Sequence, residues 1–284
     1  MAPTVAIIAP GNMGAAVGAR LVQYGATVLT SLERRSRASA ERAVAARMAG
    51  AEAGALVQAD FLLSIVPPGE AVALAERLAP ALRATNRKPF DADCNAVSPA
   101  TVARIAAVVA QTGAPFADAG IIGPPPRPGT DNTRFYVSGP ESGRLAALND
   151  YGLSIRMLDG AVGDASALKM CYGGLNKGVT ALGAAMALAA TRAGVGDAFR
   201  AELAESQSAL LGKLGRGVPD MFDKAYRWVA EMEEIAAFTG AQAERETYRG
   251  LAALFARLAS DHAGEGREIA DLAAFFAAAP TKPT

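Results

Sequence analysis

Histidine is almost missing from this chain of 284 residues, which contains a single one, His262. Histidine is the commonest metal ligand in proteins and the usual base of a serine triad. A single histidine nearly excludes histidine-based metal sites and serine–histidine triads, and we expect no metal. Any proton transfer must then depend on other side chains.

Cysteine is scarce as well. The two cysteines, Cys94 and Cys171, are far apart and match no metal-ligand spacing. They are typical of reduced thiols in a cytosolic protein, so we expect a cytoplasmic location. We find neither a signal-peptide pattern at the N-terminus nor a run of about 18 apolar residues that would predict a membrane span.

The chain also lacks an excess of either charge. Lys and Arg together number 28, and so do Asp and Glu. This balance gives no electrostatic footprint for nucleic acid or for an anionic membrane, and we expect neither partner. Apolar residues make up 51% and charged residues 20%, a globular composition with material for one large domain or two of ordinary size.

Short apolar runs alternate with helical patterns up to about residue 162. This alternation predicts an α/β domain, a mainly parallel, doubly wound sheet with helices on both faces. The helical segments include 14–24, 36–49 and 70–82. The predicted strands are Val5–Ala9, Thr27–Ser31, Phe61–Val66, Phe90–Cys94, Pro115–Ala119, Phe135–Ser138 and Ser154–Leu158.

The strand pattern stops after Gly163. Asp164 can cap a helix that continues through Thr191, a rod of about 45 Å. Further helical stretches follow at 197–214, 219–238, 241–259 and 266–278. We therefore predict two domains, an α/β domain over residues 1–162 and an all-α domain over residues 163–284.

A glycine-containing turn follows the first predicted strand, in the stretch IIAPGNMGAAVGARL. Gly11 can let the backbone approach a pyrophosphate, and Gly14 allows close packing of helix on strand. The amides of Asn12 and Met13 would lie at the positive end of that helix, where phosphates bind. The turn predicts a Rossmann-type dinucleotide site, although Ala9 replaces the usual first glycine. The alternative is a strand–helix turn that binds nothing.

The end of the second strand indicates which cofactor binds. An NAD site usually has an acidic residue there, about 20 residues after the glycines. This chain offers Ser31, Arg34, Arg35 and Ser36 instead, which suit the 2′-phosphate of NADP(H). Alternatively, Glu33 binds the ribose and the arginines are merely solvated, so that NAD(H) remains possible.

Several segments occur in a familiar order and spacing after the glycine turn. They are Ala59–Pro68, Asp93–Pro99, Asp118–Gly123, and Gly160–Gly163 leading into Lys169. Together they resemble the β-hydroxyacid dehydrogenase superfamily. It includes 3-hydroxyisobutyrate and 6-phosphogluconate dehydrogenases and, more distantly, imine reductases.

The resemblance implies a cleft between the domains, with the nicotinamide near Val66, Pro67, Pro68 and Asn95. It also implies that Lys169 is the general acid/base, which removes the alcohol proton while hydride leaves the carbon. An amine shielded from water loses its proton more readily, which suits this task. The alternative for Lys169 is a surface lysine. A homodimer, in which each subunit closes the other's cleft, is implied as well.

Three departures from the family pattern concern the substrate. Ile122 takes the place of a serine in the substrate loop, and Pro124 follows Gly123 where a second glycine is usual. We expect Ile122 and Gly123 to border the substrate. Asn95 stands where hydroxyacid-specific members commonly have serine, and Gly173 where an asparagine is usual.

Other side chains can supply the polar group that Gly173 does not offer. Positions 169, 172, 173 and 176 share one helix face, so Asn176 and then Tyr172 are the candidates. The alternative is that Asn176 is solvated. Trp228 can form a wall of the substrate pocket or belong to the core. Glu231 stands at a position where the family often has lysine, and a glutamate there suits a neutral or cationic substrate.

The sequence thus predicts an NADP(H)-dependent oxidoreductase that interconverts an alcohol and a carbonyl compound, with Lys169 as proton donor and acceptor. Ile122 and the following prolines favour a small-molecule substrate that is bulkier or less acidic than the family's usual ones. Two alternatives stay open, an imine reductase and a non-catalytic dinucleotide-binding protein.

Overall fold

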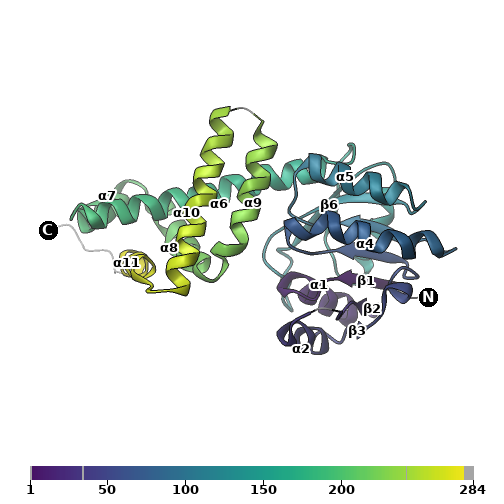
Figure 1. The fold of residues 1–284 in the computed structure, drawn as a ribbon. Helices are drawn as coiled ribbons and strands as arrows, with labels where there is room; N and C mark the ends of the chain where they lie inside the picture. Colours follow the sequence, from purple (N-terminus) through teal and green to yellow (C-terminus); the bar gives the residue numbers. More distant parts are fainter. Residues whose placement is uncertain (1, 34, 241, 278–284) are drawn as a thin grey trace. The chain divides into compact units, whose positions relative to one another are not determined.

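A computed structural model describes residues 2–33, 35–240 and 242–277. The chain divides into two compact units, residues 1–170 and residues 171–284. The first contains all the strands of the described chain, and the second is helical (Figure 1).

The first unit is built on one sheet of eight strands in the order β3-β2-β1-β4-β5-β6-β7-β8. All neighbouring pairs are parallel except β6 and β7. Every predicted strand is present, and only the two-residue β3 escaped prediction, because so short a strand has no recognisable period. The strands are β1 (Thr4–Ile8), β2 (Thr27–Thr30), β3 (Ala49–Gly50), β4 (Phe61–Ser64), β5 (Phe90–Asp93), β6 (Phe116–Ile122), β7 (Arg134–Ser138) and β8 (Ile155–Met157).

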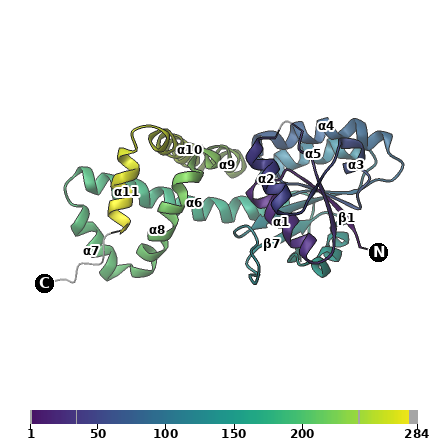
Figure 2. The ribbon, with the colours of Figure 1, turned by 90° about the horizontal axis from the view of Figure 1, so that it is seen from below.

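Helices cover both faces of this sheet (Figure 2). Successive residues of a strand point to opposite faces, so Val5 and Ile7 join one core, and Ala6 and Ile8 the other. The first core includes α1 (Asn12–Gln23), α2 (Arg37–Ala45) and η2 (Ser142–Tyr151). The second includes α3 (Ala53–Leu56), α4 (Ala71–Ala84) and α5 (Pro99–Ala110), with η1 (Pro68–Glu70) leading into α4. The predicted doubly wound α/β fold is confirmed.

The helical part begins with the long predicted helix, which is present as α6 (Asp164–Arg192). The helix predicted over 197–214 is wrong, because the chain breaks at Gln207, where φ is −141° and ψ is 47°. The helix predicted from residue 219 is also wrong at its start, since Pro219 lies inside α8. The remaining elements are α7 (Gly196–Ser206), α8 (Ser208–Met221), η3 (Phe222–Lys224), α9 (Ala225–Thr239), α10 (Gln242–Ala263) and α11 (Arg267–Ala277).

Glycines on α6 allow its neighbours to pack closely. A Cβ atom at Gly174 would lie 2.8 Å from the hydroxyl of Tyr248 on α10, and one at Gly183 would lie 2.4 Å from a methyl group of Leu214 on α8. Helices α9 and α10 lie side by side as a hairpin (Figure 1). Within the described ranges, no helix is both long and apolar enough to span a membrane.

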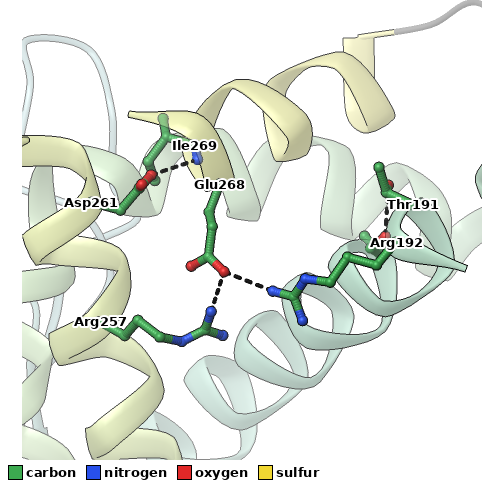
Figure 3. Close-up of polar contacts among 7 residues, drawn as sticks. Thr191, Arg192, Arg257, Asp261, Glu268 and Ile269 are labelled. Atoms are coloured by element: carbon green, nitrogen blue, oxygen red, sulfur yellow. Dashed lines mark hydrogen bonds and ion pairs between the residues drawn. The ribbon is translucent and has the colours of Figure 1, made fainter. Parts of the chain in front are cut away.

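Charged side chains attach α11 to the rest of the helical unit (Figure 3). The Glu268 carboxylate accepts a hydrogen bond of 2.7 Å from Arg192, at the end of α6, and another from Arg257 on α10. The Asp261 carboxylate accepts a 2.9 Å hydrogen bond from the Ile269 amide in the first turn of α11. The C-terminal end of α6 is therefore held by α10 and α11.

Candidate functional site

The strand order places four loops at one edge of the sheet. The glycine turn follows β1, Val66–Pro68 follows β4, Asn95 follows β5, and Gly123 follows β6, which ends at Ile122. These strands are parallel neighbours, so their carboxyl ends meet at the same edge. In open α/β sheets this edge binds ligands.

The glycine turn has the open backbone that a pyrophosphate needs. A Cβ atom on Gly14 would lie 2.0 Å from the Ala9 carbonyl oxygen, so this position has no room for a side chain. A Cβ atom on Gly11 would have no atom within 4 Å. Helix α1 begins at Asn12 without a side-chain cap, which leaves the amides of its first turn, including that of Met13, for an anion.

Arg35 lies between the end of β2 and η1. Its guanidinium is 3.7 Å from the Glu70 carboxylate, and its side chain is 18% exposed. Among the described residues its Nε atom has no hydrogen-bond partner, although it is buried. Ser31 is half-buried nearby in the chain. Arg34, which is also predicted to bind the 2′-phosphate, lies outside the described residues.

Arg42 on α2 was not predicted as a site residue from the sequence. Its Nε donates a 3.2 Å hydrogen bond to the Pro10 carbonyl in the glycine turn, and its Nη2 donates one of 2.9 Å to the Ser39 hydroxyl. Ser36, which caps α2, has its hydroxyl 3.2 Å from that of Ser39. The three residues are spaced at intervals of three on one helix, which was the only sequence signal of this cluster.

Asn95 is buried in a hydrogen-bond network, with 2% of its surface exposed. Its Nδ2 donates to the Ser64 hydroxyl at 2.8 Å and to the Asp93 carboxylate. Its Oδ1 accepts a 2.6 Å hydrogen bond from the Val66 amide. The side chain therefore fixes the start of the Val66–Pro68 loop, and its predicted contact with nicotinamide remains a prediction.

Three buried aspartates lie on neighbouring strands β5 and β6. Burial raises the pKa of Asp91 from 3.8 to about 7. Burial, together with the nearby Asp118 and Asp91, raises the pKa of Asp93 to about 8, although hydrogen bonds from Asn95 oppose the rise. Burial also raises the pKa of Asp118, and hydrogen bonds from Ser166 limit that rise.

Asp118 anchors the first turn of α6. Its Oδ2 accepts hydrogen bonds from the amides of Gly163 (3.0 Å) and Ser166 (2.8 Å), and its Oδ1 accepts one of 2.7 Å from the Ser166 hydroxyl. The Ser138 hydroxyl on β7 accepts a further one of 3.0 Å from the Ala165 amide. Side chains of the sheet thus accept the hydrogen bonds of the amides in the first turn of α6, which have no partner within the helix.

The predicted capping by Asp164 is therefore wrong. Asp164 is the first residue of α6, and its carboxylate accepts a 3.1 Å hydrogen bond backward from the Ala161 amide. The reason is that Asp118 on β6 already accepts the hydrogen bonds that a capping side chain would accept. It lies 45 residues before Gly163 in the chain.

Lys169 lies against the end of β6. Its Nζ donates a 2.6 Å hydrogen bond to the Ile121 carbonyl, and its side chain is half-buried. Gly120 makes this approach possible, because a Cβ atom there would lie 2.7 Å from the Ala165 carbonyl and 3.1 Å from the Cβ of Lys169. The first unit thus holds the Lys169 amine next to Ile122.

The loop after β6 is tightly held. Ile122 is buried, with 5% of its surface exposed. Gly123 has φ of +120°, and a Cβ atom there would lie 2.1 Å from the Asn132 carbonyl oxygen, so the turn requires glycine. Arg20 on α1 donates to the carbonyls of Arg127 (2.6 Å) and Thr130 (2.9 Å). Hydrogen bonds from α1 therefore hold the loop that contains the prolines.

In the helical unit, Glu231 fills the space beside Gly173. A Cβ atom at Gly173 would lie 3.1 Å from Oε1 of Glu231, which also forms a 2.6 Å ion pair with Lys177. The Asn176 amide donates to the Tyr172 carbonyl of its own helix at 3.0 Å, and the Tyr172 side chain is half exposed. The catalytic roles predicted for Asn176 and Tyr172 remain predictions.

Trp228 is half-buried on α9. Its ring makes an edge contact with Phe255, at 5.2 Å between centroids, and Lys177 Nζ lies 5.3 Å from the ring centre. This packing suits the core alternative, and the predicted role in a substrate pocket stays untested. In the part of the chain that the structure describes, no cluster of three histidine, cysteine or acidic side chains could hold a metal ion.

Comparison with known families identifies the chain. Residues 4–145, half of its length, match the NAD binding domain of 6-phosphogluconate dehydrogenase. The chain belongs to the β-hydroxyacid dehydrogenase superfamily. Residues 190–258 of this superfamily member match a domain of unknown function. No curated protein matches the sequence significantly.

Solved structures similar to this superfamily member cover nearly the whole chain. One is a conserved protein of unknown function with structural similarity to 3-hydroxyacid dehydrogenases; it has 26% identity and a TM-score of 0.68, over 93% of this chain and 99% of that one. Another is 3-hydroxyisobutyrate dehydrogenase from Mycobacterium tuberculosis, which has 21% identity and a TM-score of 0.65, over 98% of this chain and 99% of that one. A third is an imine reductase from Myxococcus stipitatus in complex with NADP⁺. It has 20% identity and a TM-score of 0.55, over 96% of this chain and 99% of that one.

Proposed function

We propose that the protein is an NADP(H)-dependent oxidoreductase that interconverts an alcohol and a carbonyl compound and acts as a homodimer. The observation that carries the proposal is the Lys169 amine, held at the end of β6 by the Ile121 carbonyl. This end of β6 belongs to the same sheet edge as the glycine turn. A cytoplasmic location is part of the proposal, since both cysteines are free thiols.

The residues at the sheet edge fit a dinucleotide. The space over Gly11 and the uncapped start of α1 suit a pyrophosphate, and Val66–Pro68 and Asn95 would border the nicotinamide. Ser31 and Arg35 would hold the 2′-phosphate, and the unpartnered Nε of Arg35 supports this assignment among the described residues. A bound nicotinamide would supply hydride to a carbonyl carbon, or accept it from an alcohol carbon.

Lys169 would move the proton that accompanies hydride transfer. In the oxidation direction its neutral amine takes the proton from the alcohol oxygen, and in reduction the ammonium returns a proton to the carbonyl oxygen. An ammonium has three N–H donors. Since one is directed at the Ile121 carbonyl, the orientation of the other two is restricted.

Two residues, one in each unit, support a substrate without a phosphate group. Ile122, beside Lys169 on β6, offers no hydrogen bond to a carboxylate. Within the helical unit, Glu231 stands at a position where the family often has lysine, and its carboxylate lies beside Gly173. We propose a neutral or cationic hydroxy compound, because Ile122 offers an acidic group no hydrogen bond and the Lys177 ammonium is already paired with Glu231.

An imine reductase is the second candidate, favoured by the same Glu231 carboxylate, which would suit a cationic imine. A screen of NADPH oxidation with aldehydes, ketones and cyclic imines, and of NADP⁺ reduction with alcohols, separates the candidates. We expect turnover of a carbonyl–alcohol pair. Turnover of imines alone would favour the second candidate, and NADP(H) binding without any turnover would favour a non-catalytic protein.

The Gly11→Ala variant tests the pyrophosphate site. Gly11 has φ of −69°, which alanine adopts, and the added methyl group meets no protein atom within 4 Å. We therefore expect the melting temperature to stay within about 2 °C, while NADP(H) affinity falls at least about tenfold, or about 1.4 kcal/mol. Calorimetric titration measures the affinity, and Gly54→Ala on α3, equally uncrowded, is the matched control. Unchanged affinity in Gly11→Ala would show that the pyrophosphate binds elsewhere.

The Arg35→Ala variant tests the cofactor preference. We expect the dissociation constant for NADPH to rise about 10- to 100-fold and that for NADH to change less than about twofold, because only NADPH has the 2′-phosphate that Arg35 would bind. Fluorescence titration of both nucleotides measures this. Arg37→Ala removes an arginine of α2 that pairs with Glu41 and should leave both values unchanged. A wild-type protein that prefers NADH would contradict the assignment.

A further inference from the structure

Asn95 follows β5 and has most of its side-chain hydrogen-bonding groups occupied. Both hydrogens of its Nδ2 are used, one on the Ser64 hydroxyl at 2.8 Å and one on the Asp93 carboxylate. Its Oδ1 accepts the hydrogen bond of the Val66 amide, and only 2% of the residue is exposed. The amide therefore has one acceptor position left for a ligand, and its other groups connect the ends of β4 and β5.

The Val66 amide lies just beyond the backbone ladder between these two strands. A hydrogen bond of 2.9 Å runs from the Cys94 amide to the Ser64 carbonyl. In a regular parallel pair the next bond would join the Val66 amide to the Cys94 carbonyl. The Val66 amide instead donates to Oδ1 of Asn95, at 2.6 Å. The start of the Val66–Pro68 loop is thus held by a side chain where the backbone ladder ends.

Asp93, the last residue of β5, accepts hydrogen bonds from Asn95 with both of its carboxylate oxygens. Oδ1 accepts from the side-chain Nδ2, and Oδ2 accepts a longer bond of 3.4 Å from the backbone amide. The residue is 1% exposed, and burial of an ionisable group is unfavourable unless the group is hydrogen-bonded. The contact with Asn95 is therefore the role that the structure shows for this buried carboxyl.

The contact between Asp93 and Asn95 does not require a charge. A protonated carboxyl keeps a carbonyl oxygen, which accepts the Nδ2 hydrogen bond as a carboxylate oxygen does. An asparagine at position 93 would offer the same carbonyl oxygen. A valine fits a buried strand but has no acceptor, so it would leave one Nδ2 hydrogen of Asn95 without a partner. The orientation of the Asn95 amide therefore depends on an acceptor at position 93.

We propose that Asp93 is a positioning residue for the nicotinamide end of the cofactor. Asp93 fixes the orientation of the Asn95 amide, and Asn95 in turn fixes the Val66 amide. The Val66–Pro68 loop then borders the nicotinamide in one geometry. Asp93 acts through Asn95 and does not touch the cofactor itself. This inference rests on the proposed function, from which it takes the place of the nicotinamide.

Asp91 provides a matched comparison within the same strand. It lies two residues before Asp93, so its side chain points to the same face of the sheet, and it is buried as well, at 6% exposure. The side chain of Asn95 bonds to Ser64, Asp93 and Val66, and Asp91 is not among these partners. An effect of burial alone would be shared by both aspartates, whereas the positioning of Asn95 belongs to Asp93.

Calorimetric titration of the full-length protein with NADP⁺ and with 2′-phospho-ADP-ribose, which lacks the nicotinamide, tests the inference. Asp93→Val should raise the dissociation constant for NADP⁺ at least about tenfold and that for 2′-phospho-ADP-ribose less than about twofold. Asp93→Asn, which keeps the acceptor, and Asp91→Val, the control, should both stay within about threefold of the wild type for NADP⁺. Equal losses for both ligands in Asp93→Val, or no loss for NADP⁺, would overturn the inference.

A double variant tests whether Asp93 acts through Asn95. Asn95→Ala removes the amide that Asp93 orients, so Asp93→Val should weaken NADP⁺ binding no further in that background. The two effects are then non-additive, as expected for residues of one hydrogen-bond network. Fully additive losses would show that Asp93 acts by another route.

Amide hydrogen exchange without any nucleotide separates this inference from the proposed function. In Asp93→Val the Val66 amide should exchange at least about tenfold faster than in the wild type, because its acceptor is no longer held. The Cys94 amide, which donates to the Ser64 carbonyl, should keep its rate. An unchanged Val66 rate would overturn the positioning role even if the protein binds NADP⁺. A wild type that does not bind NADP⁺ but shows the faster Val66 exchange in Asp93→Val would contradict the proposed function and, with it, the nicotinamide as the group positioned.

Discussion

Replacing Lys169 by alanine is expected to lower turnover about 10²- to 10⁴-fold, the range that general acid–base catalysis contributes. The affinity for NADP(H) should change less than about threefold, because the cofactor residues at the sheet edge are untouched. The fold should persist, since Asp118 and Ser138 anchor α6 independently of the lysine. Single-turnover kinetics on the substrate identified by the screen, with a parallel binding titration, measure both quantities.

Two further variants separate proton transfer from charge. Lys169→Arg keeps a positive charge but cannot release a proton, so it should be as inactive as the alanine variant. Added ethylamine should partly restore Lys169→Ala by supplying the missing amine. The control is Lys213→Ala, an exposed lysine on α8, which should keep full activity. Full activity of Lys169→Arg would show that the lysine acts only as a positive charge.

The sequence predicted those features that depend on neighbouring residues. Strands such as β1 and β4 were identified because each is a short apolar run between turns, and α6 because its helical pattern continues without a break. The end of α8 was missed because Pro219 usually begins a helix rather than lying inside one. The break at Gln207 was missed because no glycine or proline, the usual helix-breaking residues, lies there.

The candidate site was predictable to the extent that its residues are adjacent in the chain. The glycine turn was found in this way, whereas Lys169 was assigned from the resemblance to the superfamily. The hydrogen bonds from Asn95 to Ser64 and from Gly163 to Asp118 connect residues 31 and 45 positions apart, and no local pattern reveals such pairs. The same holds for Glu231, whose position beside Gly173 depends on how α9 packs on α6.

Asp91 makes the stability of the protein depend on pH. Asp91 on β5 is paired with Leu62 of β4 and Phe116 of β6, and burial raises the pKa of its carboxyl from 3.8 to about 7. An unfolded chain therefore releases the proton from about pH 4 upward, while the folded chain retains it until about pH 7. The contribution of Asp91 to the free energy of unfolding is therefore fully present below pH 4, and it is lost as the pH rises to about 7.

The Asp91→Asn variant removes this penalty, because an amide does not ionise. We expect it to exceed the wild type in unfolding free energy by an amount that grows by about 1.4 kcal/mol per pH unit from pH 4 and levels off near 4 kcal/mol above pH 7. Urea unfolding between pH 5 and pH 9 measures the difference, and Asp150→Asn, on the exposed side of η2, should show no such growth. A constant difference across this range would mean that Asp91 ionises at the same pH in the folded and unfolded chains, and burial would then not control its charge.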